Sequence, residues 1–169
     1  MEQTIEVKAE EVKTEPAITY HLASVFDVPL ITLMWRDMVA EELSGFIIVD
    51  DDELRRYAFA MTDMIRQWNQ IVIVAKCEGR MIGFTHAYVY QNKYGKPITM
   101  AFSESSYVKP DYRAKGIGME LVENCRAVIA KRELQIDCEE FTVPYDQEHI
   151  DSWAKRGWVP TRVIMRKRG

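Results

Sequence analysis

The residues best suited to chemistry lie in one stretch near the middle of the chain, Val108 to Met119. This stretch leaves an apolar segment typical of a strand, crosses a polar loop and enters a segment with helical periodicity. Arg113 and Lys115 supply positive charge, while Gly116 and Gly118 let the backbone approach a ligand without a Cβ in the way. A helix start offers unpaired N–H groups and the positive end of the helix dipole. We therefore expect this loop to hold the pyrophosphate of a large cofactor.

Two other kinds of phosphate-binding loop do not fit the sequence. A P-loop requires Gly-x-x-x-x-Gly-Lys followed by Ser or Thr, and no such run is present. A dinucleotide loop requires Gly-x-Gly-x-x-Gly directly after a strand; Gly116 and Gly118 match two positions, but Leu121 occupies the third. The distance in sequence from Val108 to Gly116 is also too long for that tight turn.

The hydrophobic pattern predicts an α/β fold around the loop. Strands are predicted over residues 17–24, 71–75, 81–90, 98–108, 135–143 and 158–168. Helices are predicted from 27 to about 44, from 50 to 68, directly after the loop, and over 146–156. This order implies a single domain with a mixed, mostly antiparallel sheet, flanked by helices on both faces.

The first two helices carry recognisable start signals. Asp27 is expected to cap the first helix, with Pro29 in its first turn. Its predicted core face consists of Leu30, Leu33, Met34 and Met38. Asp50 and Glu53 have the spacing of a capping box for the second helix. The predicted apolar face of that helix consists of Leu54, Tyr57, Ala58, Met61, Ile65 and Trp68.

No metal site is expected. The acidic run Asp50–Glu53 could suggest a calcium loop, but the sixth and twelfth positions of an EF-hand counted from Asp50 hold Arg55 and Met61. The three histidines share no ligand spacing, and the three cysteines are far apart. The acidic run is therefore interpreted as the first turn of a helix.

Composition bounds the remaining possibilities. The 169 residues suit one domain, with a Glu- and Lys-rich leader over 1–16 and the folded domain over 17–169. The chain lacks an apolar run long enough for a membrane span and has no apolar signal segment. The odd number and wide spacing of the cysteines favour a reducing, cytoplasmic setting.

A net charge of -4 argues against nucleic-acid binding, although the basic C-terminal end keeps an enzyme that acylates nucleic acids as a weaker alternative. A monomer or a homodimer paired through the last strand is expected.

The loop, read as Val108-x-Pro110-x-x-Arg113-x-x-Gly116-x-Gly118, resembles the acyl-CoA loop of the GNAT superfamily of N-acetyltransferases. Residues 153–158, Trp-Ala-Lys-Arg-Gly-Trp, resemble the late helix of that family, and the order of elements over 17–169 agrees. The segment 34–38 together with Glu104 resembles the small members found in phage genomes.

The resemblance implies acetyl-CoA as acyl donor, an amine as acceptor and direct attack within a ternary complex. Backbone groups at Tyr107 and Val108 would bind the pantetheine arm, in a cleft where the strand ending at Val108 splays from the next strand. Trp153 would border the cofactor. The pyrophosphate would be wrapped by the N–H groups of Arg113, Ala114, Lys115, Gly116, Ile117 and Gly118, and Met119 would also belong to the cofactor site.

The sequence specifies the catalytic residues less completely than the cofactor-binding loop. The resemblance makes the Val108 N–H the oxyanion donor, and Glu104 is the candidate base, unless it faces solvent beside Ser103 and Ser105. The usual family acid is a tyrosine at the position of Trp153, whose indole cannot supply a proton. Tyr145 is the proposed substitute, with Tyr107 or water as alternatives. A binding protein with the same fold and no turnover is the competing hypothesis.

Overall fold

The computed structural model describes residues 16–42, 49–92, 98–141 and 147–160. Within them, five strands form one sheet in the order β1-β2-β3-β4-β5. The strands are β1 Ile18–Leu22, β2 Gln70–Cys77, β3 Arg80–Asn92, β4 Ile98–Val108 and β5 Cys138–Phe141. The first four pair antiparallel, and β5 runs parallel to β4. This confirms the predicted mixed, mostly antiparallel sheet.

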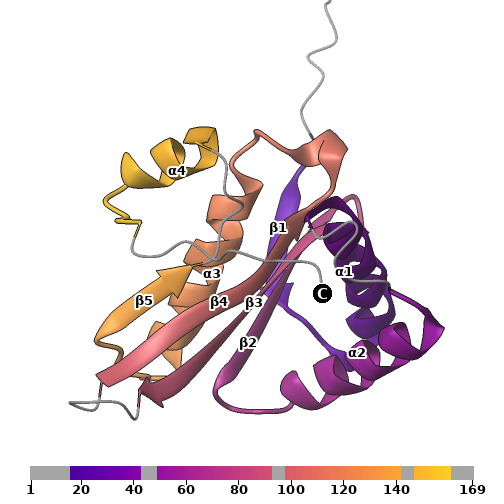
Figure 1. Cartoon of the computed structure of the whole chain (residues 1–169), viewed down its shortest axis with the longest axis horizontal. Coiled ribbons are helices and arrows are strands. Elements are labelled where there is room, and N and C mark those ends of the chain that lie inside the picture. The colour runs from indigo at the N-terminus through magenta and orange to yellow at the C-terminus, as the bar shows by residue number, and fades with distance from the viewer. Residues whose placement is uncertain (1–15, 43–48, 93–97, 142–146, 161–169) are drawn as a thin grey trace, which may run out of the picture.

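Helices cover both faces of the sheet (Figure 1). Helices α1 (Val28–Glu42) and α2 (Asp51–Met64) lie on one face, α3 (Ile117–Lys131) packs on the other, and α4 (Gln147–Ala154) follows β5. Helix α3 connects β4 to β5, which is why these two strands are parallel. None of the helices in the described ranges is both long and apolar enough to cross a membrane.

The alternation of side chains along the central strands divides the core into two layers. Phe84 and Tyr107 belong to the layer beneath α1 and α2, together with Met34 and Met61. Ile82 belongs to the layer beneath α3. Because neighbouring residues in a strand point to opposite faces, Tyr107 faces the α1–α2 side and Val108 the α3 side.

The hairpin between β2 and β3 follows the sequence prediction. Glu78 and Gly79 form its turn with φ values of 49° and 75°. Positive φ at both central residues is the geometry of a two-residue hairpin turn whose twist matches that of the strands.

The predicted cap of α1 is wrong. Asp27 lies at the end of a 3₁₀ turn, Val25–Asp27, which leads directly into α1 and is capped by Ser24. The Asp27 carboxylate accepts hydrogen bonds from the Ser24 N–H (2.9 Å) and hydroxyl (2.8 Å). It also pairs with Lys76 of β2 at 2.8 Å, so its main role is to tie this turn to the sheet.

The predicted core face of α1 is only half right. Met34 and Met38 are buried, but Leu30 and Leu33 are 49% and 44% exposed. The buried positions in the first turns are Val28 and Ile31 instead. The first turns are apolar on most sides, so periodicity alone could not decide which stripe meets the sheet.

Helix α2 begins as predicted. The Asp50 carboxylate accepts a hydrogen bond from the Glu53 N–H at 2.8 Å, and Met61 is fully buried. Trp68 lies beyond the helix end and is 62% exposed, so it does not belong to the apolar face. No strand is present over 158–160, and the rest of the predicted last strand lies outside the described residues.

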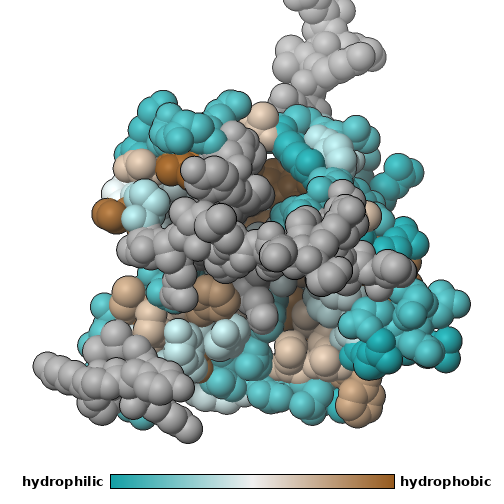
Figure 2. Space-filling model, in the orientation of Figure 1, coloured by the Kyte–Doolittle hydropathy of each residue, from teal (hydrophilic) through white to brown (hydrophobic). Residues whose placement is uncertain are grey.

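Hydrophilic residues cover much of the described surface over α4 and over the outer side of α2 (Figure 2).

Candidate functional site

The end of β4 carries a peptide group that faces away from its antiparallel partner. Val108 lies opposite Gly83, and the next residue, Lys109, donates its N–H to the carbonyl of Ile82 at 2.9 Å. In an antiparallel ladder this bond makes Gly83–Val108 a non-hydrogen-bonded pair. The N–H and C=O of Val108 therefore point away from β3, toward the side on which β5 lies.

The described part of β5 pairs with only one half of β4. The two strands pair over Met100–Ser103, and the residues that follow Phe141 lie outside the described ranges. No described strand pairs with the β5-side edge of β4 from Ser105 to Val108, and we call this edge the gap. The resemblance implies a splay between the strands at this place.

A β-bulge at Glu104 separates the residues of β4 that pair with the described part of β5 from the residues that do not. Ser103 lies opposite Ala87 and Ser105 opposite His86, so Glu104 is the extra residue between them. Bulges bend a strand and change the direction of the side chains around them. The Glu104 side chain lies outside the described part of the structure, so its role as the base stays a prediction.

The loop after β4 presents a run of backbone donors. Ala114 and Gly116 have positive φ values of 60° and 78°, and α3 begins at Ile117. The first helical hydrogen bond comes from the Glu120 N–H to the Gly116 carbonyl at 3.1 Å. Among the described residues, no acceptor bonds the N–H groups from Ala114 to Met119. Such a turn before a helix start is a concave site for an anion.

The fold does not require a glycine at position 118. Its φ is not positive, and a Cβ built on it would meet no atom within 4 Å. Gly116, by contrast, needs its positive φ. The open space at Gly118, on a helix start with unpartnered donors, fits the close approach of a ligand.

Arg113 turns back toward the end of β4 and α1. Its Nε donates to the Val108 carbonyl at 2.8 Å, and its Nη2 pairs with the Glu41 carboxylate at 2.6 Å. The guanidinium carbon lies 5.3 Å from the centre of the Tyr107 ring. Arg113 thereby fixes one side of the Val108 peptide, while the Val108 N–H has no partner among the described residues.

Glu41 is a site residue that the sequence did not reveal. One carboxylate oxygen accepts the Tyr107 O–H at 2.9 Å, and the other binds Arg113. We call Glu41, Tyr107 and Arg113 the Glu41 cluster. Glu41 precedes its partners by 66 and 72 residues, so no local pattern signals the contact.

The Glu41 cluster keeps the Tyr107 phenol protonated. Burial, the hydrogen bond to Glu41 and the negative charge of Glu41 together raise the pKa of Tyr107 to about 12. A phenol with such a pKa is neutral at physiological pH and gives up its proton reluctantly.

Three hydroxyl groups line the α3 face of the sheet beside the gap. Thr85 Oγ1 lies 3.2 Å from Ser103 Oγ and 2.6 Å from Ser106 Oγ, and the two serines are 3.4 Å apart. We call these residues the hydroxyl cluster. They satisfy one another in a buried setting, at the level where β5 leaves β4.

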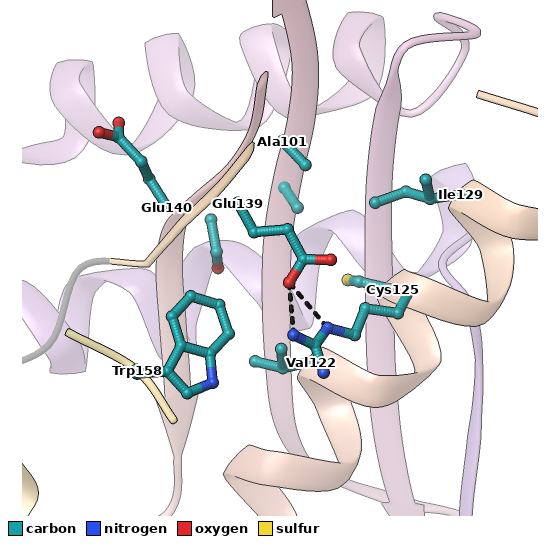
Figure 3. Close-up of a pocket in the computed structure, with 10 residues that line it drawn as sticks. Ala101, Val122, Cys125, Ile129, Glu139, Glu140 and Trp158 are labelled. Carbon is teal, nitrogen blue, oxygen red and sulfur yellow. Dashed lines mark hydrogen bonds and ion pairs between the residues drawn. The ribbon is translucent and has the colours of Figure 1, made fainter. Parts of the chain in front are cut away.

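A cleft continues from the hydroxyl cluster under α3 (Figure 3). Its cavity volume is only ≈ 30 Å³, because most of the ≈ 330 Å³ of empty space between the lining residues is open to solvent. The sheet supplies Ala87, Ala101 and Ser103, and α3 supplies Val122, Cys125, Arg126 and Ile129, with Glu139, Glu140 and Trp158 completing the lining.

An ion-pair cluster closes one side of the cleft. Arg126 donates to Glu139 from two nitrogens (2.8 and 2.5 Å) and to Glu123 at 2.8 Å. Its guanidinium carbon lies 5.3 Å from the centre of the Trp158 ring. Figure 3 shows the Glu140 carboxylate turned away from the Glu139 carboxylate.

Of the two remaining predicted site residues, Trp153 and Tyr145, the structure describes only the first. Trp153 on α4 is half-buried and packs edge-on against Trp158, with ring centres 5.6 Å apart. Tyr145 lies outside the described residues. Within the described ranges, no three His, Cys, Asp or Glu side chains gather as metal ligands.

His86 lies opposite Ser105, next to the bulge. It is 3% exposed, and its Nε2 is 2.6 Å from the Gln70 side-chain oxygen. Burial lowers the pKa of His86 to about 4, so the imidazole is neutral at physiological pH.

Comparisons with known proteins agree with this geometry. The family model of the acetyltransferase (GNAT) domain matches residues 68–160, more than half of the chain. No curated protein matches the sequence.

Solved structures share the fold at low sequence identity. A transcriptional regulator from Bacillus halodurans C-125 is 17% identical with a TM-score of 0.70, covering 90% of this chain and 100% of its own. An aminoglycoside acetyltransferase from an uncultured soil metagenomic sample, in complex with trehalose, is 17% identical with a TM-score of 0.65, covering 90% and 95%. A predicted acetyltransferase from Clostridium acetobutylicum with acetyl-CoA is 13% identical with a TM-score of 0.71, covering 90% and 96%. Together, the family match and the observed fold show that this chain belongs to the GNAT family of acetyltransferases.

Proposed function

We propose that the protein transfers an acetyl group from acetyl-CoA to an amine by direct attack in a ternary complex. The observation that carries the proposal is the outward-facing N–H of Val108, which borders the gap between β4 and β5. The loop with unpartnered N–H groups lies a few residues farther along the chain. The first feature suits a thioester oxygen and the second suits a pyrophosphate.

The proposed reaction forms one bond and breaks one. The amine nitrogen attacks the thioester carbon, a C–N bond forms and the C–S bond breaks. The carbonyl oxygen gains charge during attack, and the Val108 N–H would stabilise it. The amine loses a proton and the departing thiolate gains one.

The proton carriers remain proposals. Glu104 is the proposed base, and the proposal is supported by the β-bulge at this residue, directly after the last β4 residue that pairs with the described part of β5. Tyr145 is the proposed acid. Tyr107 is poorly suited to that role, because its O–H is held by Glu41 and its pKa is raised to about 12. A reference thiol pKa of about 8.5 also lets water protonate the leaving group.

The test is release of free thiol from acetyl-CoA in the presence of a panel of primary amines. Gly116→Trp should abolish thiol release and acetyl-CoA binding, because the indole would fill the loop. Gly79→Trp is a matched control, since Gly79 has a similar φ (75° against 78°) and equally open surroundings, in the β2–β3 turn and outside the loop. Acetyl-CoA that fails to bind the wild type, or that binds Gly116→Trp normally, would overturn the proposal.

A second candidate is an acyl-CoA-binding protein without turnover. Trp153, where the family has its acid, favours this candidate. It predicts that acetyl-CoA binds, that no amine releases thiol and that Glu104→Gln changes nothing measurable.

A further inference from the structure

Glu41 lies at a position where an α-helix does not favour an acid. It belongs to the last turn of α1, and that turn holds no basic residue. A carboxylate there meets the negative end of the helix dipole, which is unfavourable. The side chains of Glu41 and Arg113 are 41% and 46% exposed, and ion pairs as exposed as this one contribute little to stability. The stability of α1 therefore does not explain an acid at this position.

The two bonds that Glu41 accepts lead to the two sides of one peptide group. The peptide between Tyr107 and Val108 carries the Val108 N–H, the proposed oxyanion donor. On the Tyr107 side, Glu41 accepts the phenol O–H at 2.9 Å. On the Val108 side, Glu41 binds Arg113 Nη2 at 2.6 Å, and Arg113 Nε donates to the Val108 carbonyl at 2.8 Å. One carboxylate thus restrains both residues that flank the donor.

This restraint matters because the end of β4 is paired on one side only. Strand β3 holds it there, and the last bond runs from the Lys109 N–H to the Ile82 carbonyl at 2.9 Å. On the other side, no described strand pairs with β4 beyond Ser103. A strand held along one edge can change its twist, which would turn the Val108 N–H away from a fixed direction. A donor stabilises developing charge best when its direction is set before the reaction.

We propose that Glu41 is a positioning residue for acyl transfer, which through Tyr107 and Arg113 fixes the direction in which the Val108 N–H meets the thioester oxygen. This inference rests on the proposed function and adds a residue that acts through its neighbours. It also separates the roles of the two loop cations. The Arg113 charge is balanced by Glu41 and lies 5.3 Å from the centre of the Tyr107 ring, so the pyrophosphate is left to the backbone donors and Lys115.

The test uses acetyl-CoA labelled with ¹³C at the acetyl carbonyl, bound to the full-length protein without an acceptor amine. A hydrogen bond from Val108 polarises this carbonyl and should move its NMR signal downfield from that of free acetyl-CoA. Glu41→Gln should lose most of this displacement, because an amide has a single acceptor oxygen and cannot accept from Tyr107 and Arg113 through separate oxygens.

The affinities for CoA and acetyl-CoA, measured by calorimetry, give a second readout. CoA lacks the carbonyl, so Glu41→Gln should keep the wild-type affinity for CoA. Loss of the hydrogen bond to the thioester should lower the ratio of acetyl-CoA affinity to CoA affinity by about fivefold. A change that merely loosened the fold would weaken both ligands and leave this ratio unchanged.

Two further variants test the path and the specificity of the effect. Arg113→Met has a similar length but no donor and should also reduce the displacement. The double variant of Glu41→Gln and Arg113→Met should lose less than the sum of the two single losses, because Glu41 acts partly through Arg113. Asp52→Asn, at an acid of an exposed ion pair on α2, should keep the wild-type signal and ratio.

Tyr107→Phe removes only the phenol bond and should lose part of the displacement, so it replaces Glu41→Gln if that variant does not fold. A wild-type displacement and ratio in Glu41→Gln overturn the positioning role and leave the proposed function standing. Fully additive losses in the double variant also overturn it. Failure of acetyl-CoA to bind the wild type contradicts the proposed function itself, and a bound wild-type carbonyl without displacement contradicts the Val108 donor.

Discussion

At the scale of single residues, a substitution at Gly118 distinguishes an effect on stability from an effect on ligand affinity. Gly118→Ala should leave the free protein as stable or about 0.5–1 kcal/mol more stable, because alanine favours a helix and its Cβ meets no atom. Binding of acetyl-CoA should weaken at least tenfold, because the Cβ would occupy space needed by the pyrophosphate. Urea unfolding and calorimetry measure the two effects. Unchanged affinity in a stable variant would remove Gly118 from the site.

Glu41 is expected to control the ionisation of Tyr107. Glu41→Gln removes a negative charge and weakens a hydrogen bond, so the pKa of Tyr107 should fall from about 12 but stay above the ordinary value of 10, since burial remains its first cause. Alkaline absorbance titration measures this shift, and Tyr107→Phe identifies the signal. Stability should change by less than about 1 kcal/mol, because both members of the pair with Arg113 are about half exposed.

The control for Glu41→Gln is Asp52→Asn, which neutralises an acid in another exposed ion pair, on α2. This variant should leave the Tyr107 titration unchanged. An identical tyrosine titration in the wild type and Glu41→Gln would contradict the contact between Glu41 and Tyr107.

His86 should make the fold sensitive to acid. The pKa of His86 in the folded protein, about 4, is below the reference value of 6.5, so the unfolded chain binds a proton first as the pH falls. The stability contributed by neutral His86 is complete above pH 6.5 and is lost as the pH falls toward 4. At pH 5 the loss should be about 2 kcal/mol.

Urea unfolding at pH 7 and pH 5 measures this loss. His86→Leu should be less sensitive to the change in pH than the wild type, whereas His21→Leu, at an exposed histidine, should behave as the wild type. An equal pH dependence in all three proteins would show that His86 is not the group responsible.

At the scale of elements, the contact between β3 and β4 sets the position of the Val108 peptide. A Cβ on Gly83 would lie 2.9 Å from the Tyr107 carbonyl oxygen and 3.3 Å from a Val108 methyl group. Gly83→Ala should therefore push the strands apart, costing about 1–3 kcal/mol. Acetyl-CoA binding should weaken as well, because the Val108 N–H moves.

Urea unfolding and calorimetry again separate stability from affinity for Gly83→Ala. The matched comparison is Gly118→Ala, the same change at a position where the added Cβ meets no atom, and it should not lose stability. Wild-type stability of Gly83→Ala would contradict the tight approach of β3 to β4.

The sequence predicts where strands and helices lie better than it predicts which side of a helix is buried or which distant residues contact one another. The predicted span of β4 agrees with the structure to the residue, Ile98–Val108, because Pro97 and Pro110 bound the strand-forming segment. Leu30 and Leu33 were misassigned because α1 has two apolar stripes, and only the sheet chooses between them. Glu41 was missed because its partners join it only through the folded chain.

The anion loop was predictable because its residues are consecutive. The glycines, the cations and the helix start all fall within a few positions, so local rules place them together. The cleft was not predictable, since it depends on small side chains from β3, β4 and α3 that meet only in the folded sheet.

At the scale of the whole molecule, the domain is proposed to begin near residue 17. A chain that begins at Pro16 lacks only the Glu- and Lys-rich leader and should keep the midpoint of thermal unfolding and the affinity for acetyl-CoA. Differential scanning calorimetry and isothermal titration measure both quantities. A loss of either would place part of residues 1–15 in the folded domain or its site.

The central claim is that the open edge of β4 and the loop before α3 together hold acyl-CoA. The most direct test is a titration of the ¹⁵N-labelled protein with CoA, followed by amide chemical shifts. The account predicts saturable shifts that are largest at Val108 and from Ala114 to Met119, with Gln91 and Thr99, at the opposite end of the β3–β4 pair, unchanged. No saturable shift, or shifts confined to residues away from this edge and loop, would contradict it.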